Sequence, residues 1–226
     1  MARLRHKLLW TGLLVVIAAI PLTVHADSVI LFNTFGPGHT YDCCQDFSES
    51  GSNVGPYISA MAFTPNTTSP LFAIDLAIGS GQVNDQFTLA LMSTNGGLPG
   101  SILESWSLTT TFHLALCNHC FETALSTLHP VLQGGTQYWL VVFPSSDMDG
   151  GWFASNDAQG TSAFSSDRGK TWTPHANSQM GAFDVRGISN TAVPEPSTII
   201  LLGSGLLGIT AARRKTRRAP KFFGAE

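Results

Sequence analysis

Positive charges are scarce in the middle of this 226-residue chain. Residues 27–193 contain three Lys or Arg against 13 Asp or Glu, a formal charge of −10, although the whole chain carries only −3. Because nucleic acids are bound through basic surfaces, this composition excludes nucleic acid as an expected partner. The other Lys and Arg residues lie near the two ends of the chain.

The common signatures of enzymes are also missing from the sequence. It contains no G-x-S-x-G, H-E-x-x-H or P-loop pattern. One G-x-G-x-x-G match, at residues 203–208, follows no predicted strand and therefore does not indicate dinucleotide binding. We expect a protein that is not an enzyme and needs no cofactor.

Strand patterns dominate between the two ends, where no long helical periodicity occurs. Apolar residues alternate with small or polar ones over 72–78 and 87–91, which is the period of strands with one buried face. Residues 136–143 form a continuous β-prone run that predicts a central strand. Gly, Ser, Asn and Pro predict loops at 33–56, 64–70, 93–100 and 144–151. We predict one all-β domain over 27–189, an antiparallel β-sandwich resembling a jelly roll.

The first 26 residues have the three parts of a secretory signal peptide. Arg3, Arg5 and Lys7 precede an apolar run over 8–20, and residues 24–26 have the small-residue form of a cleavage site. An uncleaved signal anchor is the alternative. In both cases the domain that follows is exported and faces the periplasm.

The C-terminal region contains three segments in a fixed order. The motif Val193, Pro194, Glu195 and Pro196 forms a rigid break, because proline fixes φ and removes backbone donors. An apolar stretch predicts one membrane helix over about 197–212, although its length of roughly 21–24 Å is short for a bilayer core of about 30 Å. The basic tail 213–226 holds a cluster that favours the cytoplasmic side: Arg213, Arg214, Lys215, Arg217 and Arg218.

Residues 190–226 resemble the PEP-CTERM sorting signal of exported bacterial proteins, with the motif itself at 193–197. The resemblance implies recognition and cleavage by an exosortase, a membrane-embedded cysteine-dependent transpeptidase. The domain would pass from an inner-membrane-anchored intermediate, facing the periplasm, to the cell surface or an extracellular polysaccharide matrix. The short membrane segment is thus interpreted as a temporary membrane anchor that is removed by processing.

The domain itself is similar to small exported β domains of the choice-of-anchor R type. The similarity lies in residues 62–65, 71–79, 87–91 and 97–100 and implies no known activity. We therefore expect an exported, non-catalytic cell-surface or matrix protein. The alternative is a carbohydrate-binding module, with calcium as a candidate ligand.

Four cysteines, Cys43, Cys44, Cys117 and Cys120, predict disulfides in an exported chain. Because bridging adjacent residues is strained, two bridges between 43/44 and 117/120 are favoured; a closed loop of about 75 residues would stabilise the fold by about 4 kcal/mol. A zinc site is the alternative, since Cys117 and Cys120 have C-x-x-C spacing and His113 lies four residues earlier.

Residues 165–172 fit the Asp-box pattern S-x-D-x-G-x-T-W. The pattern predicts a hairpin in which Asp167 accepts hydrogen bonds from turn amides, Gly169 has positive φ, and Trp172 packs beneath the turn. It resembles a motif of sialidase propellers, but these repeat it and need an arginine cluster for the substrate. We therefore expect a structural turn without sialidase activity.

Two candidate ligand features lie around Gly150 and Gly151. Asp147, Asp149 and Asp157 offer oxygen ligands for calcium, with a solvated loop as the alternative. Trp152, expected in the same loop, is a candidate stacking face for a sugar ring.

Overall fold

The computed structural model describes residues 28–52, 55–113 and 121–189, which form 13 strands and no helix. The predicted signal peptide, membrane helix and basic tail lie outside these residues. Among the residues described, no helix is long and apolar enough to cross a membrane. The strands are β1 (Ser28–Asn33), β2 (Asp42–Ser50), β3 (Ile58–Phe63), β4 (Ser69–Leu76), β5 (Ile78–Ser80), β6 (Gln86–Asn95), β7 (Leu98–Thr109), β8 (Glu122–Leu125), β9 (Val131–Leu132), β10 (Tyr138–Pro144), β11 (Asp149–Ser165), β12 (Thr173–Gly181) and β13 (Phe183–Ile188).

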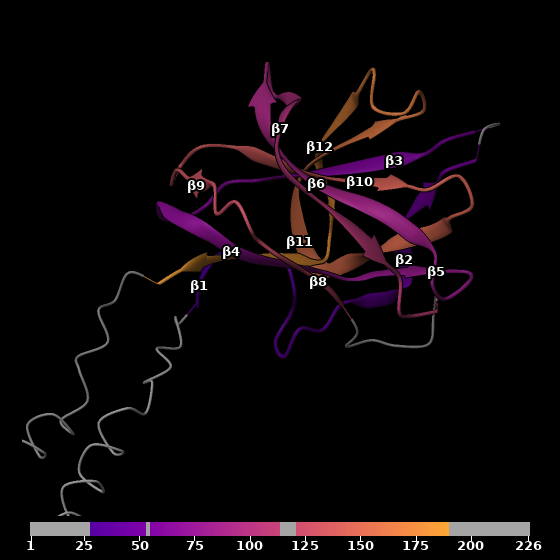
Figure 1. Cartoon of the computed structure of the whole chain (residues 1–226), viewed down its shortest axis with the longest axis horizontal. Helices are drawn as coiled ribbons and strands as arrows, with labels where there is room; N and C mark the ends of the chain where they lie inside the picture. Colours follow the sequence, from indigo (N-terminus) through magenta and orange to yellow (C-terminus); the bar gives the residue numbers. More distant parts are fainter. Residues whose placement is uncertain (1–27, 53–54, 114–120, 190–226) are drawn as a thin grey trace, which may run out of the picture. The chain divides into compact units, whose positions relative to one another are not determined.

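The strands form two antiparallel sheets (Figure 1). The five-stranded sheet has the order β1-β13-β4-β8, with β9 paired to β4. The eight-stranded sheet has the order β12-β11-β3-β10-β6-β7, with β2 and β5 paired to β11. The all-β, antiparallel prediction is confirmed, and so is the central strand, because β10 lies between β3 and β6. The finer likeness to a jelly roll stays a prediction.

Both sheets contribute side chains to one apolar core. On β4, Ile74 and Leu76 are fully buried in this core, as the alternation predicts, but Ala73 and Asp75 between them are buried as well, on the other face of the strand. They belong to one cluster with residues of the other sheet, including Leu89 of β6 and Leu140 of β10. Burial of each such side chain contributes about 1.5–3 kcal/mol, so this two-sheet core is the main source of stability.

β11 is the longest strand, and its two halves have different partners. Its first half pairs with β2 and β5, and its second half with β3 and β12. Three predicted loops are wrong: residues 33–56 include β2, residues 93–100 consist mostly of the end of β6 and the start of β7, and residues 144–151 include the start of β11. The polar sequence of β2 shows no apolar alternation. A strand forms there nevertheless, because its backbone pairs with β11.

An ion cluster lies on the face of the five-stranded sheet that is turned away from the core. Asp75 of β4 and Asp184 of β13 are cross-strand neighbours, and both are buried. The Arg186 guanidinium lies 2.7 Å from Asp75 Oδ2 and 3.4 Å from Asp184 Oδ1. Burial, followed by the negative charge of Asp75, raises the pKa of Asp184 to about 6, against the opposing effect of Arg186.

The turn between β11 and β12 confirms the Asp-box prediction. Asp167 Oδ1 accepts the N–H groups of Lys170 at 3.0 Å and Thr171 at 2.9 Å, and Oδ2 accepts the Thr171 hydroxyl at 2.6 Å. Gly169 has φ +80°, and Trp172 packs against the apolar cluster on the outer side of the eight-stranded sheet. The hydrogen bonds from Thr171, from its side chain first, lower the pKa of Asp167 to about 2.

This lowered pKa predicts a stabilisation that depends on pH. For a carboxyl group with a depressed folded-state pKa, the contribution is present above the unfolded pKa of about 3.9 and is lost as the pH falls through about 2. Asp167→Asn keeps the shape of the side chain and removes its charge. We expect the variant to have a lower Tm than wild type at about pH 5, and the difference to shrink toward pH 2, as measured by circular dichroism. Asp157→Asn, at an exposed position of β11, is the control; a Tm difference that does not change with pH would contradict this account.

Candidate functional site

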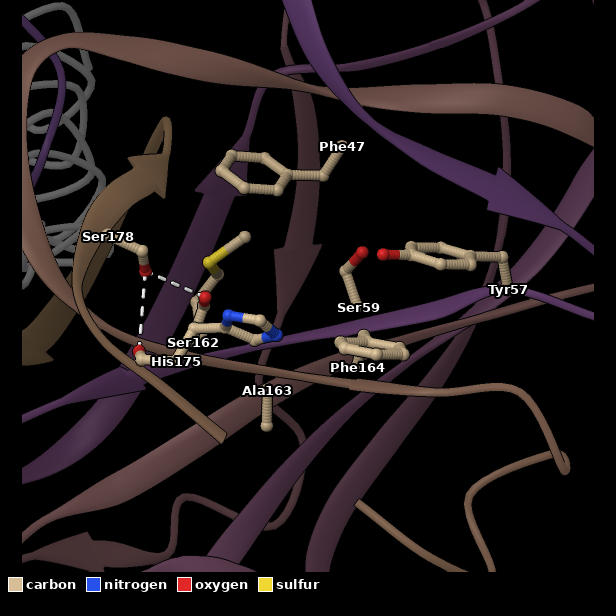
Figure 2. A pocket seen from close by; sticks show the side chains of 9 residues that line it. Phe47, Tyr57, Ser59, Ser162, Ala163, Phe164, His175 and Ser178 are labelled. Carbon is tan, nitrogen blue, oxygen red and sulfur yellow. Dashed lines mark hydrogen bonds between the residues drawn. The ribbon is translucent and has the colours of Figure 1, made fainter. Parts of the chain in front are cut away.

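A pocket of about 200 Å³ lies where β2, β3, β11 and β12 meet (Figure 2). The antiparallel pairing of β11 with β3 and β12 brings side chains from four chain segments together here. The lining residues are Phe47, Tyr57, Ser59, Met61, Ser162, Ala163, Phe164, His175 and Ser178.

Aromatic rings form one part of the pocket wall. The rings of Tyr57 and Phe164 are stacked, with centroids 5.4 Å apart and an interplanar angle of 5°. The His175 ring packs against Phe164 of this pair, with centroids 5.2 Å apart and an interplanar angle of 33°. Because Tyr57 is 37% exposed, the stack is open to solvent. An exposed tyrosine ring of this kind can pack against a flat, partly apolar ligand.

Hydroxyl groups form the other part of the wall. Ser162 and Ser178 share a hydrogen bond of 2.8 Å, and the Ser178 hydroxyl donates to the carbonyl oxygen of His175 at 3.4 Å (Figure 2). Ser59 and Tyr57 add two more hydroxyls to the lining. Each hydroxyl both donates and accepts, so the pocket suits a ligand that carries hydroxyl groups of its own.

Glu49 of β2 lies directly behind this wall. Its side chain is fully buried, and Oε2 accepts the backbone N–H of Ser59 at 3.2 Å. Its other oxygen, Oε1, has no hydrogen-bond partner among the described residues. Burial raises the pKa of Glu49 well above its usual range, and the charge of Asp46 adds to this, while the hydrogen bonds from Ser59 act in the opposite direction.

The predicted calcium ligands are not brought together. Asp147, Asp149 and Asp157 are all exposed, the first in the turn before β11 and the others on β11. Within residues 28–52, 55–113 and 121–189, one group of three His, Cys, Asp or Glu side chains has its ligand atoms within 4.8 Å of one another. That group contains none of these three aspartates. The structure therefore does not bring these three residues together as one ligand group, because β11 runs through the segment in which a loop is expected; calcium binding itself stays a prediction.

Trp152 is not a stacking face for a sugar. It lies within β11 and is fully buried, where its indole N–H donates to the carbonyl oxygen of Ala182 at 3.0 Å. Its ring also packs edge-to-face against Phe183, with centroids 5.6 Å apart. The neighbouring glycines suggested a loop, but they serve strand packing, and the buried indole belongs to the core.

The cysteine prediction is only partly covered by the described residues. Cys43 is half-buried and Cys44 is exposed on β2, and their thiols lie 3.7 Å apart. Cys117 and Cys120 lie outside the described residues, so the bridges and the zinc alternative stay predictions. Phe121 packs against the same cluster of Phe35, Tyr41 and Phe153 as Cys43 does.

The sequence predicted none of the pocket residues. They come from four strands or strand ends, and the pocket arises only through the pairing of β11 with its neighbours. The one local indication is that serines occupy the buried strand positions 59 and 162, where apolar residues are the norm.

The raised pKa of Glu49 leads to a testable prediction about stability. A group whose folded-state pKa is raised stabilises the protein fully below its unfolded pKa of about 4.3, and this contribution is lost as the pH rises through the folded-state value. Glu49→Gln stays neutral, so we expect its Tm relative to wild type to rise as the pH increases from about 4 to neutral. Thermal unfolding of both proteins over this range tests it, with Asp157→Asn, which alters an exposed carboxyl group on β11, as the control. A relative Tm that falls with rising pH would show that Glu49 is charged and stabilising.

Comparison with known protein families gives a match at the C-terminal end. Residues 192–218 match the family described as "PEP-CTERM protein-sorting motif". They include the predicted motif and the basic cluster, and they lie outside the described part of the structure. A comparison with curated proteins found no significant match. The likeness of the domain to the choice-of-anchor R type stays a prediction. The chain thus carries a PEP-CTERM sorting motif, which marks an exported protein that passes through the membrane to the cell surface by way of exosortase processing.

Proposed function

We propose that the chain is a non-catalytic protein of the cell surface or extracellular matrix, delivered through its C-terminal motif. The observation that carries the proposal is the match over residues 192–218. In this scheme the apolar segment at about 197–212 and the cluster at 213–218 hold the exported domain at the inner membrane. An exosortase-type enzyme then cleaves near 193–197 and releases the domain to its final carrier.

The composition of the domain supports this destination. With 13 acidic residues against three basic ones in 27–193, the domain repels copies of itself, which favours solubility in a hydrated polysaccharide matrix. Such a charge also disfavours binding to anionic lipid surfaces, so contact with the membrane is assigned to the C-terminal segment alone.

Substitution of the motif tests the sorting proposal. In the double variant Pro194→Ala/Pro196→Ala we expect the protein to stay in the inner-membrane fraction with its C-terminal tail attached, because the rigid break that the processing enzyme recognises is lost. Wild type should reach the surface or medium with a mass reduced by the tail. Cell fractionation and intact mass spectrometry measure both properties. The control is Asn190→Ala/Thr191→Ala, just outside the matched residues; the same mass and location for all three proteins would refute processing.

A carbohydrate-binding module is the second candidate, and the pocket favours it. The stacked rings of Tyr57 and Phe164 offer a face for the C–H surface of a sugar, and the hydroxyls of Ser59, Ser162 and Ser178 offer partners for its hydroxyl groups. The volume of about 200 Å³ is below the roughly 300–1,000 Å³ of sites for drug-sized ligands. We therefore assign the pocket to a single sugar ring of a neutral saccharide.

Glycan binding by full-length protein tests this candidate. We expect wild type to bind a neutral glycan on an array equally well with and without calcium, since the predicted calcium ligands do not lie together. Phe164→Ala should weaken binding about tenfold, which corresponds to about 1.4 kcal/mol, and Tyr57→Ala should have a similar effect. Ile102→Ala on β7, which is also exposed but at the opposite edge of the same sheet, is the control. Absence of glycan binding under all conditions, or unchanged affinity in both pocket variants, would overturn the candidate.

A further inference from the structure

Three side chains from three separate elements converge beside the five-stranded sheet. His39 lies between β1 and β2, Asp75 on β4 and Asp184 on β13, and each offers one ligand atom within 4.8 Å of the other two. We propose that His39, Asp75 and Asp184 bind a divalent transition-metal ion such as Zn²⁺. One imidazole nitrogen and two carboxylate oxygens form a ligand set that suits such ions, with a further position left for water.

The state of Asp184 points to a missing partner. Its side chain is 1% exposed, and neither carboxylate oxygen has a hydrogen bond. Oδ2 lies 3.7 Å from His39 Nε2, and Oδ1 lies 3.4 Å from Arg186 Nε. A buried carboxylate without hydrogen bonds is costly, because it has lost its water and gained too little in return. A metal ion between Asp184 and His39 would supply the missing interaction.

The charge balance of the cluster agrees with a cation site. Asp75 and Asp184 bring two negative charges into a region from which water is largely excluded, and Arg186 returns one positive charge. One negative charge is left without compensation when His39 is neutral, which is the form that binds metals. A divalent cation offsets this excess.

The surroundings hold the ligands in place. The Thr123 hydroxyl donates to Asp75 Oδ1 at 2.6 Å, and Arg186 contacts Asp75 Oδ2 at 2.7 Å. A carboxylate has about four lone-pair sites, so two remain available for a metal. Partners of this kind orient metal ligands from outside the coordination sphere.

His39 provides both a fixed ligand and a route for the ion. Its ring stacks on Phe35, with centroids 5.1 Å apart and an interplanar angle of 7°, and meets the edge of Phe121 at 5.3 Å. Its side chain is nevertheless 42% exposed, so the cluster is reached from solvent on this side. A preformed site with an entry path is what metal binding to a folded protein requires.

Zinc titration of purified, metal-free full-length protein tests the proposal. We expect calorimetry and elemental analysis to give one bound Zn²⁺ per chain in this site, and Zn²⁺ to raise Tm. Asp184→Asn is nearly isosteric, and His39→Asn suits the backbone φ of 59° at this position. Each should lower the affinity at least tenfold and abolish the Tm increase, while His175→Ala in the pocket should bind as wild type does. Circular dichroism of the metal-free variants checks that both are folded.

Two results would overturn the proposal. Wild-type protein that binds no Zn²⁺ would identify the group as a structural ion cluster only. Affinity that is unchanged in both folded variants, but is lost when free thiols are alkylated, would assign zinc to the cysteines instead. Neither result depends on whether the C-terminal motif is processed or the pocket binds a glycan.

Discussion

The insertion of the first half of β11 between β2 and β5 is the constraint on which the rest of the domain depends. Gly150 and Gly151 permit it: a Cβ atom at Gly150 would collide with the carbonyl oxygen of Gly79, and one at Gly151 would come within 2.5 Å of the Asp46 carboxylate. Trp152 then enters the core and contacts Phe183 of the other sheet. One short segment therefore fixes the neighbouring strands and also connects the two sheets.

Both candidate sites follow from this arrangement. After the register shifts that follow Phe153, β11 pairs with β3 and β12, and this places Ser162 and Phe164 in the pocket. Phe153 itself packs on the opposite side with Phe35 and Tyr41, in the segment that carries His39. The same strand thus supports the pocket wall and the loop that brings the imidazole to Asp184.

The sequence predicts the features whose cause is local. The alternation around Ile74 and Leu89 identifies strands, because successive side chains of a strand point to opposite faces, and the Asp167 turn is determined by its own few residues. β2 could not be predicted, since its polar sequence is stabilised by pairing with β11. Asp75 and Asp184 are far apart in the sequence and meet only through the register of β4 and β13, and the pocket likewise requires the paired sheet.

The difference between local features and features that require the folded sheets also separates the sorting motif from the proposed metal site. A sorting motif is recognised as a linear segment, so residues 192–218 can be identified without any knowledge of the domain that precedes them. The proposed metal site has the opposite character, because its three ligands come from one loop and two strands. An ion bound there would cross-link the segment around His39 to β4 and β13, in a protein that has few charges available for ion pairs. Metal binding would therefore stabilise the domain, because an ion that binds only the folded state shifts the equilibrium toward it.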